Sequence, residues 1–127
     1  MDRKKLQIKK IESLLSQKIK DIYKEQLEQE LNDISYQLFD HTLIITLEGI
    51  VTSPEKLLKE HNSPHLAKQV REAIDRVIQP QIQTVIEEVL NVKVIDFLSD
   101  TTIDRDLTGA IAIFELKPND ISDSYKS

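Results

Sequence analysis

A helical pattern of apolar residues at the beginning of the chain is the feature that most restricts its fold. In residues 3–31 an apolar residue recurs every three or four positions, with no proline or glycine among them, as expected for a long amphipathic helix. Two adjacent pairs, Leu14 with Leu15 and Ile22 with Tyr23, make the apolar face wider than the seam of a two-stranded coiled coil. Such a face lies on a sheet or between two partners, so this helix needs further elements to cover it.

Strand-like segments follow in two pairs. Residues 34–39 and 43–51 are rich in β-branched and aromatic types and are separated by an Asp-His turn, which predicts a β-hairpin. Residues 92–98 and 110–116 predict a second hairpin, whose connector is rich in aspartate. In the first hairpin the alternation directs three residues toward the core: Leu43, Ile45 and Leu47.

Two helices are expected between these hairpins. Thr52 followed by Glu55 fits a capping box that opens a short helix. A longer helix is expected over residues 64–90, where the apolar stripe keeps its phase across Pro80, so the proline predicts a kink and not a break. Asn91 is the predicted left-handed residue that ends this helix.

The element order predicts an α+β fold. It comprises a long N-terminal helix and two β-hairpins that form a mainly antiparallel four-stranded sheet, with the helices packed on one face. Residues 1–117 are expected to form a single domain, because a chain of 127 residues can bury one sizeable core. Residues 118–127 are polar and are expected to be a disordered tail. The sheet edges and the second face of the sheet need cover, and together with the broad face of the first helix they favour a homodimer.

Charge and composition exclude several classes of protein. The net charge is −5, and residues 32–127 hold nine Lys and Arg against sixteen Asp and Glu. An acidic body repels a polyanion, so nucleic acid is not expected as a partner, and the basic residues near the N-terminus are interpreted as a solvated helix face. No apolar run approaches the roughly 20 residues of a membrane span. Cysteine is absent and no apolar stretch follows the first basic residues, which together predict a cytoplasmic location.

Two spacings imitate metal sites. Asp104, Asp106 and Glu115 match the spacing of an EF-hand calcium loop. The competing interpretation is an acidic hairpin connector, because Glu115 falls in a predicted strand where a calcium loop would start a helix. His61 and His65 are four residues apart, but a predicted helix start lies between them. The two glycines of the chain are isolated and cannot form a phosphate-binding loop, so no metal and no cofactor is predicted.

Five polar residues form the candidate surface for a ligand or partner. Glu48 and Glu55 flank the turn after the first hairpin, and Arg71 lies on the following helix; such a cluster could bind an anion or transfer a proton if burial raised a carboxyl pKa. We favour the alternative in which Glu55 caps the short helix while Glu48 and Arg71 form a surface ion pair. Ser99 and Asp100 complete the set. Since no nucleophile is paired with a base, no catalytic residue is predicted.

Three blocks carry a family resemblance. They are residues 47–55, with the sequence Leu-Glu-Gly-Ile-Val-Thr-Ser-Pro-Glu, residues 70–72, and residues 97–116, which begin with Phe-Leu-Ser-Asp-Thr. At these blocks the chain resembles the MpsC-like family, a former domain of unknown function named after a sodium-translocating, membrane-potential-generating system. The resemblance implies a cytoplasmic accessory protein of a membrane system for ion or inorganic-carbon uptake, without an established catalytic activity of its own.

Two functions are therefore expected. The leading hypothesis is a non-enzymatic, dimeric adaptor or regulatory protein that works with membrane transport subunits. The alternative is a sensor that binds a small anion, such as bicarbonate, or a nucleotide near Arg71. An enzyme ranks third.

Overall fold

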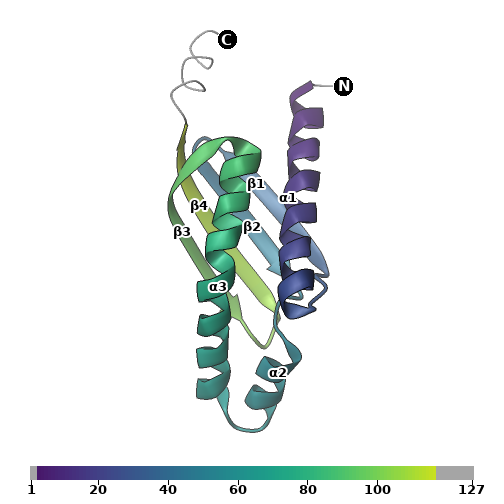
Figure 1. The fold of residues 1–127 in the computed structure, drawn as a ribbon, viewed down its shortest axis with the longest axis vertical. Helices are drawn as coiled ribbons and strands as arrows, with labels where there is room; N and C mark the ends of the chain where they lie inside the picture. The colour runs from purple at the N-terminus through teal and green to yellow at the C-terminus, as the bar shows by residue number, and fades with distance from the viewer. Residues whose placement is uncertain (1–2, 117–127) are drawn as a thin grey trace.

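The computed structural model describes residues 3–116 and has an α+β fold (Figure 1). In chain order the elements are α1 (Arg3–Leu27), β1 (Asp33–Phe39), β2 (Thr42–Glu48), α2 (Ser53–Glu60), α3 (Pro64–Leu90), β3 (Val92–Thr102) and β4 (Leu107–Leu116). The long helices α1 and α3 contact each other and lie on one face of the sheet, and α2 packs against α3. The predicted fold class is confirmed. The predicted tail, residues 118–127, lies outside the described residues.

The four strands form one antiparallel sheet in the order β1-β2-β4-β3. Each hairpin supplies one inner strand, and β2 pairs with β4 so that Leu43 lies opposite Ala112 and Ile45 opposite Ala110. These four side chains and Leu47 are buried, because alternate residues of a strand point to the same face. The predicted inward direction of Leu43, Ile45 and Leu47 is confirmed.

The core lies between the sheet and the two long helices. Each helix contributes one fully buried residue per turn: Leu15, Ile19 and Tyr23 from α1, and Ile78, Ile82 and Ile86 from α3. A spacing of four residues keeps these side chains on one helix face. Full burial of each aliphatic side chain stabilises the fold by about 1.5–3 kcal/mol. Only part of the broad apolar face predicted for α1 is buried in this way, because Leu6, Ile8 and Leu14 expose 40–45% of their surface.

The other face of the sheet carries no helix in the part of the chain that the structure describes. Its outward residues include Phe39, Leu98, Ile111 and Ile113, which expose between 36% and 53% of their surface. In the pairing of the strands they lie in the rows that alternate with those of the buried residues Leu43, Ala110 and Ala112. We call this surface the open face.

The first helix is shorter than predicted. It ends at Leu27 and not at residue 31, because Glu28 adopts a left-handed backbone with φ of +53°, a conformation that stops an α-helix. Leu31 still packs against the core, but from the loop. The helical spacing of apolar residues therefore continues as far as Leu31, although the helix ends at Leu27.

Three strand boundaries also need correction. β2 ends at Glu48, before the predicted limit of residue 51, because Gly49 has φ of +92° and turns the chain away from the sheet. β3 and β4 are longer than predicted: they pair as far as Thr102 opposite Leu107. The Asp-rich connector is therefore only residues 103–106, and Asp100 belongs to a strand.

The helices between the hairpins follow the sequence signals. The capping box of Thr52 and Glu55 is present at the start of α2, and Asn91 ends α3 in the left-handed conformation, with φ of 55°. Helix α3 is continuous through Pro80, which lies on the exposed side of the helix, where water can replace the hydrogen bond that a proline lacks. Among the described residues, none of the helices combines the length and the hydrophobicity that a membrane crossing requires.

Candidate functional site

The turn that follows β2 can only be made with glycine. Gly49 has a positive φ of +92°, and a Cβ atom at this position would lie 2.8 Å from the backbone nitrogen of Asn32. That nitrogen cannot move away freely, because its N–H donates a 2.8 Å hydrogen bond to the carbonyl of Glu48. The glycine in the Leu-Glu-Gly sequence of residues 47–49 is therefore required for steric reasons.

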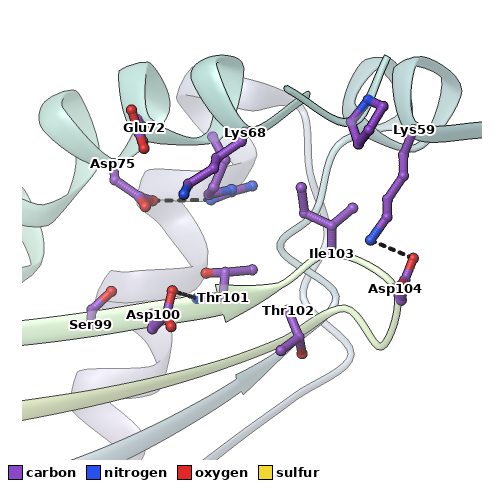
Figure 2. A pocket seen from close by; sticks show the side chains of 12 residues that line it. Lys59, Lys68, Glu72, Asp75, Ser99, Asp100, Thr101, Thr102, Ile103 and Asp104 are labelled. Atoms are coloured by element: carbon purple, nitrogen blue, oxygen red, sulfur yellow. Dashed lines mark hydrogen bonds and ion pairs between the residues drawn. The ribbon is translucent and has the colours of Figure 1, made fainter. Parts of the chain in front are cut away.

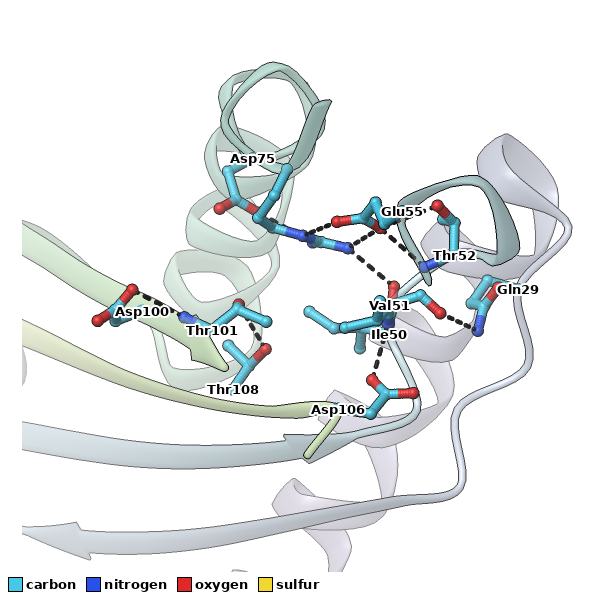
Figure 3. A network of polar contacts seen from close by, with 11 residues as sticks. Gln29, Ile50, Val51, Thr52, Glu55, Asp75, Asp100, Thr101, Asp106 and Thr108 are labelled. Carbon is cyan, nitrogen blue, oxygen red and sulfur yellow. Dashed lines mark hydrogen bonds and ion pairs between the residues drawn. The ribbon is translucent and has the colours of Figure 1, made fainter. Parts of the chain in front are cut away.

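Residues distant in sequence hold the segment after Gly49 in place. The Val51 N–H donates to Asp106 Oδ1 over 2.8 Å, and the Gly49 N–H donates to the Asp106 carbonyl over 3.2 Å. On the other side, Gln29 Nε2 donates to the carbonyls of Gly49 (2.8 Å) and Val51 (3.2 Å). The loop after α1 and the turn between β3 and β4 therefore meet at this segment (Figure 3).

A buried ion pair lies next to this segment. Glu55 is completely buried, and Arg71 exposes 5% of its surface. Arg71 donates from Nε to Glu55 Oε1 and from Nη2 to Glu55 Oε2, both over 2.7 Å, which is the bidentate geometry that suits a guanidinium and a carboxylate. It also donates to the Ile50 carbonyl (3.0 Å) and to Asp75 Oδ1 (3.1 Å).

We call this set the Arg71 clamp; Figure 3 shows its contacts. Its members are the Ile50 carbonyl, Thr52, Glu55, Arg71 and Asp75. Glu55 Oε2 additionally accepts from the Thr52 N–H (2.7 Å) and from the Thr52 hydroxyl (2.9 Å). Both carboxylate oxygens of Glu55 are thus committed to bonds inside the fold, and the carboxylate has no access to an external proton or substrate.

The electrostatics of the clamp favour a permanent ion pair. Burial on its own would lower the pKa of Arg71, but the hydrogen bond and negative charge of Glu55 outweigh it and raise that pKa above its ordinary value. Burial raises the pKa of Asp75 above its ordinary value, and Arg71 opposes this shift. A buried carboxylate and guanidinium lose their solvation, and only complete bonding of this kind makes their burial tolerable.

A groove opens beside the clamp, between α3 and the end of β3 (Figure 2). Its volume is about 520 Å³, and it is lined by Lys68, Glu72 and Asp75 of α3 and by residues 99–104. At one end Lys59 of α2 forms a 2.7 Å ion pair with Asp104. The groove has a mixed charge and several hydroxyl groups, so it suits a small polar ligand more than an apolar one. We call it the α3–β3 groove.

The five predicted residues lie in three different environments. Glu55 and Arg71 are inside the clamp. Ser99, which accepts a 2.9 Å hydrogen bond from Gln79 Nε2, lines the groove together with Asp100. Glu48 is exposed at the end of β2.

The expected surface ion pair between Glu48 and Arg71 is wrong. Arg71 turns inward to Glu55 and Asp75, because its guanidinium finds a bidentate carboxylate and a carbonyl there. Glu55 and Arg71 therefore cannot belong to an exposed surface, whereas the role of Glu48, Ser99 and Asp100 in binding a partner stays a prediction. Asp75 was missed, although its position four residues after Arg71 was an available signal for a helical ion pair.

The sequence spacings that imitate metal sites do not bring ligands together. Glu115 pairs with Lys93 near the far end of β4, and nine residues of strand separate it from Asp106 by roughly 30 Å. His61 ends α2 and His65 lies in the first turn of α3. Among residues 3–116, no three His, Cys, Asp or Glu side chains are grouped so that they could hold a metal ion.

Comparison with known proteins identifies the family. The model of the family described as the Na⁺-translocating membrane potential-generating system (MpsC) matches residues 7–116. No curated protein and no solved structure gives a significant match. The matched region includes the Arg71 clamp, the groove and all four strands, which is nearly the whole described fold. The chain therefore belongs to the MpsC family.

Proposed function

We propose that this protein is a non-enzymatic, dimeric adaptor or regulatory subunit of a membrane ion-translocating system and acts from the cytoplasm. The family description supports the link to such a system. Since no helix among the described residues is suited to cross a membrane, translocation is assigned to partner subunits. Uptake of inorganic carbon is a second process that such a system can serve.

The observation that supports the non-enzymatic part is the burial of Glu55 and Arg71 and their bonding to each other within the fold. Glu55 and Arg71 are the most deeply buried charged residues of the described chain, and a general acid or base has to reach its substrate within hydrogen-bond distance. Their partners are Thr52, Asp75 and the Ile50 carbonyl. The charges therefore serve the fold, which leaves the exposed surfaces for recognition.

A deletion strain of the native host tests this proposal. Loss of the gene is expected to lower the membrane potential measured with a voltage-sensitive dye in sodium-containing medium, and the wild-type gene is expected to restore it. Variants with reversed charge on the predicted partner surface, Glu48→Lys and Asp100→Lys, are expected to fold normally but to restore less. A membrane potential and growth that do not depend on the gene, at any sodium or bicarbonate concentration, would contradict the proposal.

A second candidate function is a sensor for a small anion or a nucleotide in the α3–β3 groove. The volume of the groove falls in the usual range for small-molecule sites, and among the described residues Lys68 takes part in no ion pair. Lys68 is then the main anion contact, because four of the five N–H groups of Arg71 are bonded within the fold. The test is a thermal shift with bicarbonate, phosphate and nucleotides that Lys68→Ala removes; no shift with any of them would exclude this function.

A further inference from the structure

The open face is a patterned apolar surface. Its central row across the sheet is Ile44, Ile111 and Leu98, which pair side by side in β2, β4 and β3. Ile113 and Phe39 extend this row on one side. Ile111 and Leu98 expose 38% and 53% of their surface. A contiguous exposed apolar patch of this kind marks an interaction site in soluble proteins.

The next row consists of Thr46, Gly109 and Asp100, which are paired in the same three strands. It has a hollow beside this ridge only at Gly109, between two side chains. Gly109 lacks a side chain, and a Cβ atom added there would meet no atom within 4 Å. An apolar ridge therefore lies one row away from a shallow depression at the centre of the sheet.

We propose that the open face binds the open face of a second copy, related by a two-fold axis that runs across the strands between these two rows. The axis places the ridge of each subunit over the hollow of the other, so that Ile111 lies over Gly109 of the partner subunit. Such an isologous contact is closed and self-complementary, as the interface of a symmetric dimer requires. Stacked sheets with interdigitated side chains are a common way to form a core.

The charges of the face fit this arrangement. The same axis brings Asp96 toward Thr102 of the partner subunit and Glu48 toward Thr42 of the partner subunit, as the row positions show. It also brings Asp100 over Leu98 of the partner subunit and Asp33 over Phe39 of the partner subunit. These carboxylates lie on the edge strands β3 and β1, at the polar rim of the interface, and no carboxylate is placed over another one. The acidic residues at the margins of the face would instead be repelled by a negatively charged membrane surface, so a second copy is the better occupant.

The size of the face approaches what a stable dimer needs. Four strands span roughly 19 Å, and strands of 7 to 11 residues are about 23–36 Å long. An area with these dimensions is of the same order as the roughly 800 Å² per partner that stable interfaces bury. This inference rests on the homodimer of the proposed function and adds the surface that forms it.

Filling the hollow tests the inference without disturbing the core. Gly109→Val adds a side chain where the subunit has free space and where a β-branched residue suits the strand, so the thermal stability of the monomer should be retained. The same side chain blocks the ridge of the partner. The mass by light scattering and the dissociation constant by analytical ultracentrifugation, measured over the micromolar range, should show a wild-type dimer whose dissociation constant rises at least about tenfold in Gly109→Val and in Ile111→Lys.

The matched control is Val77→Lys. Val77 is an apolar residue on α3 with 59% of its surface exposed, on the helical side of the molecule, so this variant should remain as dimeric as the wild type. A dimer that tolerates both Gly109→Val and Ile111→Lys would place the interface elsewhere and overturn the inference while the dimer stands. A wild type that stays monomeric throughout would overturn it as well, and the accessory role would still be decided by the deletion strain.

Discussion

The Arg71 clamp and the α3–β3 groove lie next to each other and contain the same kinds of side chain, but they use them differently. In the clamp the carboxylate oxygens of Glu55 and four N–H groups of Arg71 are bonded within the fold. In the groove Lys68 and Glu72 are exposed, and neither belongs to an ion pair of the described residues. Charged residues close together do not by themselves indicate a binding site; their burial and the number of their bonds decide between structure and recognition.

The largest effect that separates the two regions is expected from Arg71→Ala. Removal of the guanidinium leaves the buried Glu55 carboxylate without its counter-charge, although Thr52 still donates to it. Breaking a buried pair in this way costs about 3–5 kcal/mol of unfolding free energy. Urea denaturation followed by circular dichroism measures the loss. Arg76→Ala, an exposed arginine on the same helix, is the control and should change stability by less than about 0.5 kcal/mol. Equal losses in both variants would show that Arg71 stabilises the fold no more than an exposed arginine does.

The next effect concerns the turn that orients the clamp. Gly49→Ala should cost about 1–3 kcal/mol, because alanine is strained at a φ of +92° and its Cβ would approach the Asn32 nitrogen at 2.8 Å. The same substitution at Gly109, which has free space around it, should be neutral or stabilise the strand by up to about 1 kcal/mol. Thermal unfolding of the two variants measures both values. Similar melting temperatures would contradict the steric role of Gly49.

A pH-dependent effect is expected from the tyrosine beside the clamp. Burial raises the pKa of Tyr23 above its ordinary value, and Arg71 opposes this shift. Above about pH 10 the unfolded chain loses the phenolic proton while the folded state keeps it, so the stability falls as the pH rises further. Tyr23→Phe should therefore flatten the loss of stability between pH 10 and pH 11 and leave the stability below pH 9 nearly unchanged.

Tyr36 provides the comparison for this measurement. It lies on β1, away from the clamp, and burial raises the pKa of Tyr36 to about 12, with its hydrogen bond to Ser16 acting in the opposite direction. Its contribution to stability likewise falls as the pH rises above about 10. If neither Tyr23→Phe nor Tyr36→Phe altered alkaline unfolding, the tyrosines would not be its cause.

The smallest effects are expected in the groove. Lys59→Ala removes an ion pair whose partner Asp104 is 75% exposed, and such surface pairs contribute about 0–1 kcal/mol, less at high salt. Lys68→Ala removes no ion pair and should change stability by less than about 0.5 kcal/mol. Chemical denaturation at low and high salt tests both. A loss above about 2 kcal/mol for Lys68→Ala would show that the groove also serves the fold.

The sequence predicted the elements whose signals are local. The capping box of Thr52 and Glu55 spans three residues, and the alternation in residues 43–47 identified the buried side of β2. Local signals misled at the end of α1, because Leu31 keeps the apolar spacing of the helix while it packs against the core from a loop. The end of β3 was missed because residues 99–102 are polar and lack an apolar alternation. They lie on an edge strand and border the groove.

The long-range contacts of Arg71 with Glu55 and of Val51 with Asp106 could not be predicted from the sequence. Arg71 is 16 residues from Glu55, and Asp106 is 55 residues from Val51. Both contacts depend on how α3 and the β3–β4 turn pack against the turn after β2. Glu48 and Glu55 were predicted from the sequence to lie near Arg71 and Asp75 was missed, and only the packed fold distinguishes Glu55 from Glu48 as the partner of Arg71.

The position of β4 in the sheet also affects how the protein acquires its structure during synthesis. As an inner strand, β4 provides the only described pairing between the first hairpin and β3. A nascent chain that has not yet released residues 107–116 from the ribosome cannot complete its sheet, so β2 lacks its inner neighbour until translation has passed this point. A chain that stops before Leu107 is therefore expected to lack the central pairing of the sheet and not to form a smaller stable domain.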